Sequence, residues 1–119
     1  MIDIEDRLYH YKAFVRSVYD GDTIRADIDL GMFVTLENQP VRLYGIDTPE
    51  IRKKLERSKA IEARDALRSL ILERTVVIRT LKDDKEKYGR WLGEIWLGDV
   101  NVNAWMVGKG HAKYYMVGA

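Results

Sequence analysis

The spacing of apolar residues changes from a strand pattern to a helical pattern along this chain, and that change most narrows the folds it can adopt. Residues 24–30, IRADIDL, alternate strictly between apolar and polar side chains, which is the pattern of a half-buried β-strand. Over residues 55–73 the apolar side chains instead share one helical face, which carries Ala60, Ala63, Leu67 and Leu70. The sequence therefore predicts one main helix there, beginning about a turn before Ser58 or with Ser58 as its cap.

Four further stretches are rich in β-branched and aromatic residues, which favour strands. With the alternating segment they give five predicted strands, at residues 8–19, 24–30, 41–46, 76–80 and 91–97. An Asp20-Gly21-Asp22 turn is expected after the first strand, because Gly21 can adopt positive φ. Residues 81–90 are expected to form a charged loop between the last two strands.

The C-terminal part predicts a second, shorter helix. Asn101 can cap a helix over residues 102–109, Gly110 can end it, and residues 111–116 read as a short extended tail. Three strands, a helix, two strands and a short helix predict an α+β fold that is mainly β. We expect a single domain over residues 1–119, a five-stranded Greek-key barrel of OB type with one main helix.

Composition excludes several classes of protein. The 119 residues include no cysteine, which rules out disulfides, thiolate metal sites and cysteine nucleophiles. No apolar run approaches the roughly 18–20 residues of a membrane span, so no membrane partner is expected. The N-terminus has no apolar signal region. We expect a monomer that is cytoplasmic as written, with secretion left open if an upstream signal has been removed.

The overall charge of +1 does not by itself indicate a nucleic-acid-binding protein. The charge is unevenly distributed, because residues 51–59 hold five Lys or Arg side chains against one Glu. Such a local basic patch can attract phosphates even on a nearly neutral protein. A solvated loop and helix start is the simpler interpretation of the same residues.

Carboxylates at two predicted strand ends suggest a metal site. Asp22 follows the first strand and Asp47 follows the third, each beside turn-forming residues. Each motif alone is an ordinary turn or helix start. If the two strand ends meet, however, oxygen ligands without His or Cys select a hard cation, Ca²⁺ or Mg²⁺. Thr48 could add a backbone carbonyl oxygen.

Three more charged residues near these turns suit phosphodiester chemistry. Arg42 and Arg90 carry planar, permanently charged guanidinium groups that match a phosphate in a bidentate manner. A metal ion and two such groups can neutralise the charge that a phosphodiester gains when it is attacked. Glu50 then remains as a general base or as an acceptor that orients water.

Four sequence blocks together resemble the staphylococcal nuclease family, also called thermonuclease-like. They are YDGDT, VRLYGIDTPE, EKYGRWLGEIW and VNAWMVGKGHA, and they occur in the family's order over residues 15–112. The resemblance implies an OB-fold with added helices and a Ca²⁺-dependent phosphodiesterase acting on DNA and RNA. A non-catalytic nucleic-acid- or protein-binding module on the same barrel is the alternative.

The resemblance also implies a role for each matching residue. Asp22 and Asp47 are similar to the calcium carboxylates and Thr48 to the residue that gives a backbone oxygen. Arg42, Arg90 and Glu50 resemble the catalytic residues. Lys87 and Tyr88 resemble the residues that hold the terminal phosphate of a nucleotide. One departure is Glu86, because the family's type member has Asp at that position; another is that neither Tyr114 nor Tyr115 aligns with its base-stacking tyrosine.

Overall fold

The computed structural model describes the backbone of residues 3–85 and 89–115, and the side chains of residues 3–81 and 89–115. Its long strands are β1 (His10–Asp20), β2 (Thr23–Gly31), β3 (Val34–Leu43), β5 (Thr75–Lys85) and β6 (Trp91–Leu97). Three short strands are β4 (Ile46–Asp47), β7 (Val100–Asn101) and β8 (Lys113–Tyr114). The helices are η1 (Ile4–Arg7), η2 (Lys54–Glu56), α1 (Arg57–Ile71) and α2 (Val102–Gly108).

The five long strands close into a barrel. Strand β1 pairs with β2 and β5, β2 pairs with β3, and β5 pairs with β6, all antiparallel. The barrel closes where β3 runs parallel to β6 from Val41↔Trp91 to Leu43↔Gly93. A Cβ on Gly93 would lie 2.8 Å from Cγ2 of Ile78, so the closure depends on glycine there. The predicted α+β, mainly β, OB-type barrel is confirmed.

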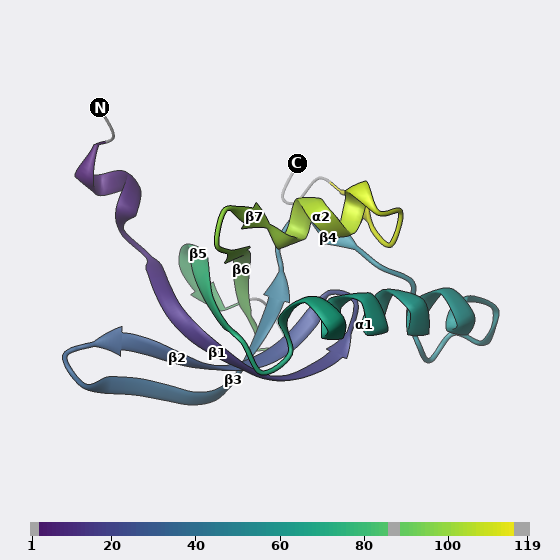
Figure 1. Cartoon of the computed structure of the whole chain (residues 1–119), viewed down its shortest axis with the longest axis horizontal. Coiled ribbons are helices and arrows are strands. Elements are labelled where there is room, and N and C mark those ends of the chain that lie inside the picture. Colours follow the sequence, from purple (N-terminus) through teal and green to yellow (C-terminus); the bar gives the residue numbers. More distant parts are fainter. Residues whose placement is uncertain (1–2, 86–88, 116–119) are drawn as a thin grey trace.

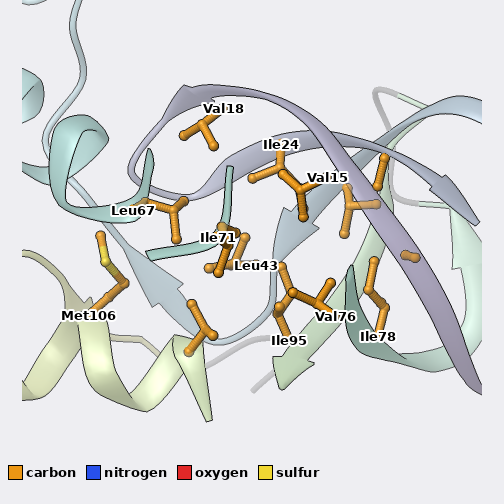
Figure 2. Packing of buried hydrophobic residues seen from close by; sticks show 14 of the residues in the cluster. Val15, Val18, Ile24, Leu43, Leu67, Ile71, Val76, Ile78, Ile95 and Met106 are labelled. Carbon is orange, nitrogen blue, oxygen red and sulfur yellow. The ribbon is translucent and has the colours of Figure 1, made fainter. Parts of the chain in front are cut away.

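The core fills the barrel and the space beneath the two α-helices (Figure 2). Ile24, Ala26 and Ile28 are buried, which confirms the inward face of the alternating segment. Helix α1 contributes Leu67 and Ile71, and α2 contributes Met106, all three with no exposed surface. Because both helices bury apolar faces on the strands, they fix the positions of the strand ends.

One buried polar residue joins α2 to the seam of the barrel. The Asn103 side chain accepts a hydrogen bond from the Ile95 N–H at 3.1 Å. It donates to the carbonyl oxygens of Tyr44 and Gly93 at 3.0 and 3.1 Å. Both of these carbonyls lie near the parallel β3–β6 pairing, so a fully bonded amide holds the closure in place.

The boundaries predicted for the third strand were wrong. The strand predicted at 41–46 is β3, which begins at Val34 and ends at Leu43; β4 follows at Ile46. The polar residues before Val41 therefore belong to β3. A register shift between Ala26 and Ile28 of β2 accommodates one extra residue of β3, so the pairing continues past it. Asn38, with φ of 51°, lies in this bulge. The β2–β3 hairpin extends well beyond the barrel, on the side away from α1 (Figure 1).

The predicted loop over residues 81–90 and the predicted helix ends also need correction. Strand β5 continues to Lys85, where it still pairs with Trp91 after a register shift, so Asp83 and Asp84 belong to a strand. Helix α1 follows the 3₁₀ turn η2, and Ser58 lies inside it and is not its cap. It ends at Ile71, because Glu73 adopts a φ of 59° that turns the chain back toward β1.

The predicted caps of the second helix are confirmed. The Asn101 side chain accepts from the N–H of Ala104 at 3.1 Å. Gly110, with φ of 80°, donates to Val107, and His111 donates to Met106, which is a Schellman ending. The tail then forms β8, which pairs with β4. No helix within residues 3–85 and 89–115 is both long and apolar enough to cross a bilayer.

Candidate active site

Six of the eight predicted site residues line one pocket of about 660 Å³. They come from the β1–β2 turn, the end of β3, the segment that begins at β4, and the start of β6. They are Asp22, Arg42, Asp47, Thr48, Glu50 and Arg90. Lys87 and Tyr88, the predicted nucleotide-phosphate contacts, lie outside the described residues.

Asp22 connects two of the segments that form the pocket. Its side chain is almost fully buried. One carboxylate oxygen, Oδ2, accepts from the backbone N–H of Thr48 at 3.1 Å, and the other, Oδ1, accepts from the hydroxyl of Thr23 at 3.1 Å. A buried carboxylate that accepts hydrogen bonds on both oxygens is held in one orientation.

The turn that carries Asp22 packs too closely for any residue larger than glycine. A Cβ on Gly21 would lie 2.8 Å from Cβ of Ala63 on α1 and 2.9 Å from Cγ2 of Thr48. The turn therefore lies directly against the helix and against the segment after β4. Gly21 does not adopt the positive φ expected from the sequence. Glycine is needed there because the close packing leaves no room for a side chain, which lets Asp22 reach Thr48.

Arg42 lies between the two predicted metal-binding carboxylates. Its Nη1 is 3.4 Å from Oδ2 of Asp22, and its Nη2 is 3.6 Å from Oδ1 of Asp47. The same Nη1 donates to the carbonyl oxygen of Leu43 at 2.8 Å. The guanidinium is buried, and its carbon lies 5.8 Å from the centre of the Tyr115 ring. Distances of 3.4 and 3.6 Å indicate Coulombic attraction between these groups more than short hydrogen bonds.

Arg90 approaches the other side of Asp22. Its Nη1 donates to Oγ1 of Thr23 at 3.4 Å, and this hydroxyl in turn donates to Oδ1 of Asp22. Arg90 is half-buried at the rim of the pocket. The two arginines, which are far apart in sequence, are therefore linked through one carboxylate. Their positive charges converge on a single cavity.

Glu50 lies on the segment that leads to η2. Its carboxylate accepts from Nε of Arg52 at 3.2 Å, and its backbone N–H donates to the carboxylate of Glu56 at 3.2 Å. The Glu50 side chain is half-buried, whereas that of Arg52 is almost fully exposed. The surface ion pair thus leaves Glu50 at the wall of the pocket, where a solute can reach it.

Sequence reasoning missed Asp20, which also lines the pocket. Burial, and after it the side-chain hydrogen bond with Asp22 and the negative charge of Asp22, raise the pKa of Asp20 to about 7. Near neutral pH its carboxyl group is therefore partly protonated. The signal was present in the Asp20-Gly21-Asp22 triplet, but turn formation alone explains an Asp at that position.

The pocket offers oxygen ligands to a cation. Within the part of the chain that the structure describes, no three or more His, Cys, Asp or Glu side chains form a metal-binding cluster. Two observations nevertheless fit a hard cation. Asp22 and Asp47 provide carboxylate oxygens on one cavity, and Oγ1 of Thr48 is buried without a hydrogen-bond partner among the described residues. Oxygen donors of this kind suit Ca²⁺, with water completing the coordination.

Comparison with known proteins identifies related sequences. A family model described as staphylococcal nuclease homologue matches residues 40–119. The chain is 34% identical to a thermonuclease of Staphylococcus intermedius over 85% of its length, and 33% identical to a thermonuclease of Staphylococcus hyicus over 82%. It is also 26% identical, over 90% of its length, to an uncharacterised protein of Methanocaldococcus jannaschii.

The barrel and the pocket at its strand ends define an OB-type protein with carboxylate and arginine side chains gathered in one site. With these matches, the chain belongs to the staphylococcal nuclease family. It spans 57–60% of the length of the three relatives.

Proposed function

We propose that this protein is a calcium-dependent nuclease that hydrolyses phosphodiester bonds of DNA or RNA by attack of water. The observation that carries the proposal is the convergence of Arg42 and Arg90 on a cavity that also holds three acidic side chains assigned here to metal binding and catalysis. Membership of a family whose matched relatives include two named thermonucleases supports the same activity.

The two arginines have the charge and the rigidity that a phosphodiester requires. In the transition state of hydrolysis, negative charge builds up on the non-bridging phosphate oxygens. Arg42 is already oriented by the Leu43 carbonyl and Arg90 by the Thr23 hydroxyl, so little reorganisation is needed when the charge develops. Pre-oriented donors of this kind account for a large share of enzymatic rate enhancement.

Glu50 is the proposed general base. Its carboxylate lies at the pocket wall beside an exposed arginine, and it can accept a proton from water or orient that water toward phosphorus. Arg42, which is buried, and Arg90, which is half-buried, lie on opposite sides of Asp22, where they would contact the negative charge of the substrate. In this arrangement Glu50 accepts the proton of water, and the arginines bind the phosphate.

Asp22, Asp47 and Thr48 are the residues that would hold Ca²⁺. When bound, the ion supplies Lewis acidity, which stabilises negative charge on phosphate oxygens. Without added cation, Arg42 offsets the charge of the two carboxylates. Lys87 and Tyr88 are proposed to hold the terminal phosphate of a bound nucleotide, as the family resemblance implies.

A digestion assay with matched variants tests this function. Wild type should degrade single-stranded DNA or RNA when Ca²⁺ is added and stop when EGTA is added. Glu50→Gln should lose activity, whereas Glu62→Gln, an exposed position on α1, should retain it. A protein that binds the oligonucleotide tightly but releases no product with Ca²⁺ would instead be the non-catalytic binding module.

A further inference from the structure

A second cavity of about 640 Å³ adjoins the catalytic pocket. The two cavities share Tyr19, Ile51 and Arg90 as lining residues. The second one is also lined by Arg25 on β2 and by Arg64 and Arg68 on α1. Its described lining includes no carboxylate, so we name it the arginine groove, after these four arginines. A concentration of positive charge without acids is unusual on a chain whose net charge is only +1.

Two of these arginines are oriented by neutral groups. Arg25 donates from Nη1 to the carbonyl oxygen of Asn38 at 2.9 Å. Arg68 donates from Nε and Nη2 to the carbonyl oxygen of Val18 at 3.3 and 3.1 Å. Neither arginine takes part in a salt bridge with a residue that the structure describes. Their charges are therefore fixed in position but not neutralised.

Helix α1, which carries Arg64 and Arg68, also presents positive charge that is not neutralised. Arg64 and Arg68 are one turn apart on α1, and like charges at this spacing repel each other. Of these two, only Arg64 has an acidic partner among the described side chains, the exposed neighbouring Asp65, at 3.1 Å. An anion lying between the two side chains would replace this repulsion with attraction on both sides. Guanidinium groups are well suited to phosphate.

Tyr19 connects the two cavities. It is 71% exposed although it lies in the barrel strand β1, and it lines both cavities. An exposed aromatic ring beside a basic groove is the arrangement with which proteins bind single-stranded nucleic acid, stacking a base on the ring while arginines contact the backbone.

We propose that the arginine groove binds the phosphates of a single-stranded polynucleotide where it continues beyond the catalytic pocket, with a base stacked on Tyr19. This inference rests on the proposed nuclease function and specifies its substrate. The preferred substrate is then a chain of several nucleotides, because such a chain can occupy the catalytic pocket and the adjoining groove at the same time.

Binding of a twelve-residue oligothymidylate, measured by fluorescence anisotropy with Ca²⁺ in a Glu50→Gln background, tests the groove directly. Arg25→Gln and Arg68→Gln should each raise Kd about tenfold by removing a charged phosphate contact. Each should also reduce the slope of log K against log salt by about 0.7. The control Arg74→Gln removes an exposed arginine outside both cavities and should change Kd less than about twofold. Tyr19→Ala should weaken binding without changing the salt slope.

Hydrolysis rates on a long and a short substrate distinguish binding in the groove from catalysis in the pocket. With Glu50 intact, Arg25→Gln should lower kcat/KM for the oligothymidylate and leave it unchanged for a 4-nitrophenyl phosphodiester of thymidine. Arg68 also anchors α1 to β1, so its variant is checked by its Tm, and the exposed Arg25 carries the test if Arg68→Gln unfolds.

The outcomes distinguish this inference from the proposed function. If Arg25→Gln binds the oligothymidylate like Arg74→Gln, with the same salt slope, the groove proposal is overturned even when the protein is an active nuclease. If the Glu50→Gln protein with an unaltered groove does not bind the oligothymidylate, the proposal is overturned as well. If the groove variants weaken binding but wild type hydrolyses neither substrate, the groove stands and the nuclease proposal fails.

Discussion

The backbone N–H of Thr48 donates to Oδ2 of Asp22 across 26 residues of sequence. This hydrogen bond joins the β1–β2 turn to the segment after β4 and thereby assembles the two halves of the pocket. Asp22 also faces the buried Arg42. The same carboxylate that is proposed as a metal ligand is therefore part of the structure that forms the site.

Substitution of Asp22 should separate these two roles. Asp22→Ala leaves the Thr48 N–H without its acceptor and Arg42 with only the exposed Asp47, so it should lower the free energy of unfolding by about 2–4 kcal/mol. Asp22→Asn keeps an acceptor of similar shape and should cost less, although both should lose Ca²⁺-dependent hydrolysis. Urea denaturation in EGTA checks this order. Equal stability of the two variants would show that the hydrogen bond contributes little.

Gly21 is predicted to be intolerant of any side chain. Gly21→Ala places a Cβ within 2.8 Å of Cβ of Ala63, and such overpacking should lower stability by about 1–3 kcal/mol. Gly108→Ala is the matched control, because a Cβ there meets nothing within 4 Å and alanine suits a helix, so it should raise Tm slightly. A Tm for Gly21→Ala equal to that of wild type would mean that the turn can move away from α1.

Thr48 provides a test of metal binding that does not depend on activity. Because its buried hydroxyl has no partner among the described residues, Thr48→Val should raise stability in EGTA by about 1 kcal/mol. The increase in Tm that saturating Ca²⁺ gives wild type should shrink in this variant and persist in Thr48→Ser. Identical calcium-induced shifts in all three proteins would exclude the hydroxyl as a contributor to the site.

The tip of the β2–β3 hairpin should be stabilised by glycine. Met32 and Phe33 adopt φ of 55° and 61°, and both side chains are fully exposed. Phe33→Gly removes the steric cost of positive φ and gives up no packing, so it should stabilise the protein by about 0.5–1 kcal/mol. Val34→Gly, the next residue along and within β3, should instead destabilise it by about 0.5–1 kcal/mol. Thermal unfolding compares the two, and a loss of stability in both variants would count against strain at the tip.

The sequence predicted most of the fold because alternation and helical spacing report directly on burial. Ile24, Ala26 and Ile28 point inward as their alternation indicates. Where charge suggested a loop, as at Asp83 and Asp84, backbone pairing of β5 with β6 extended the strand instead. The charge of a side chain predicts its exposure to water. It does not predict whether a neighbouring strand is available to pair with the backbone.

Only part of the candidate site could be predicted, because some of its properties arise from contacts that form on folding. Residue chemistry and the family blocks selected six of the ten residues that line the pocket, but their roles remain predictions. Asp20 was missed because its raised pKa arises from burial beside Asp22, which only the folded turn creates. The arginine groove was missed because Arg25 and Arg68 lie 43 positions apart and meet only when α1 packs on the barrel.

The central proposal is that buried Arg42 stabilises a phosphodiester under attack in a calcium-dependent pocket. The most direct measurement is kcat/KM on a twelve-residue single-stranded oligonucleotide with Ca²⁺, for Arg42→Ala and for the exposed-site control Arg16→Ala. We predict a loss of about 10²–10³-fold for Arg42→Ala and almost none for Arg16→Ala, with no hydrolysis by any variant in EGTA. If folded Arg42→Ala stays within about twofold of wild type, where a contributing donor should cost far more, the claim is contradicted.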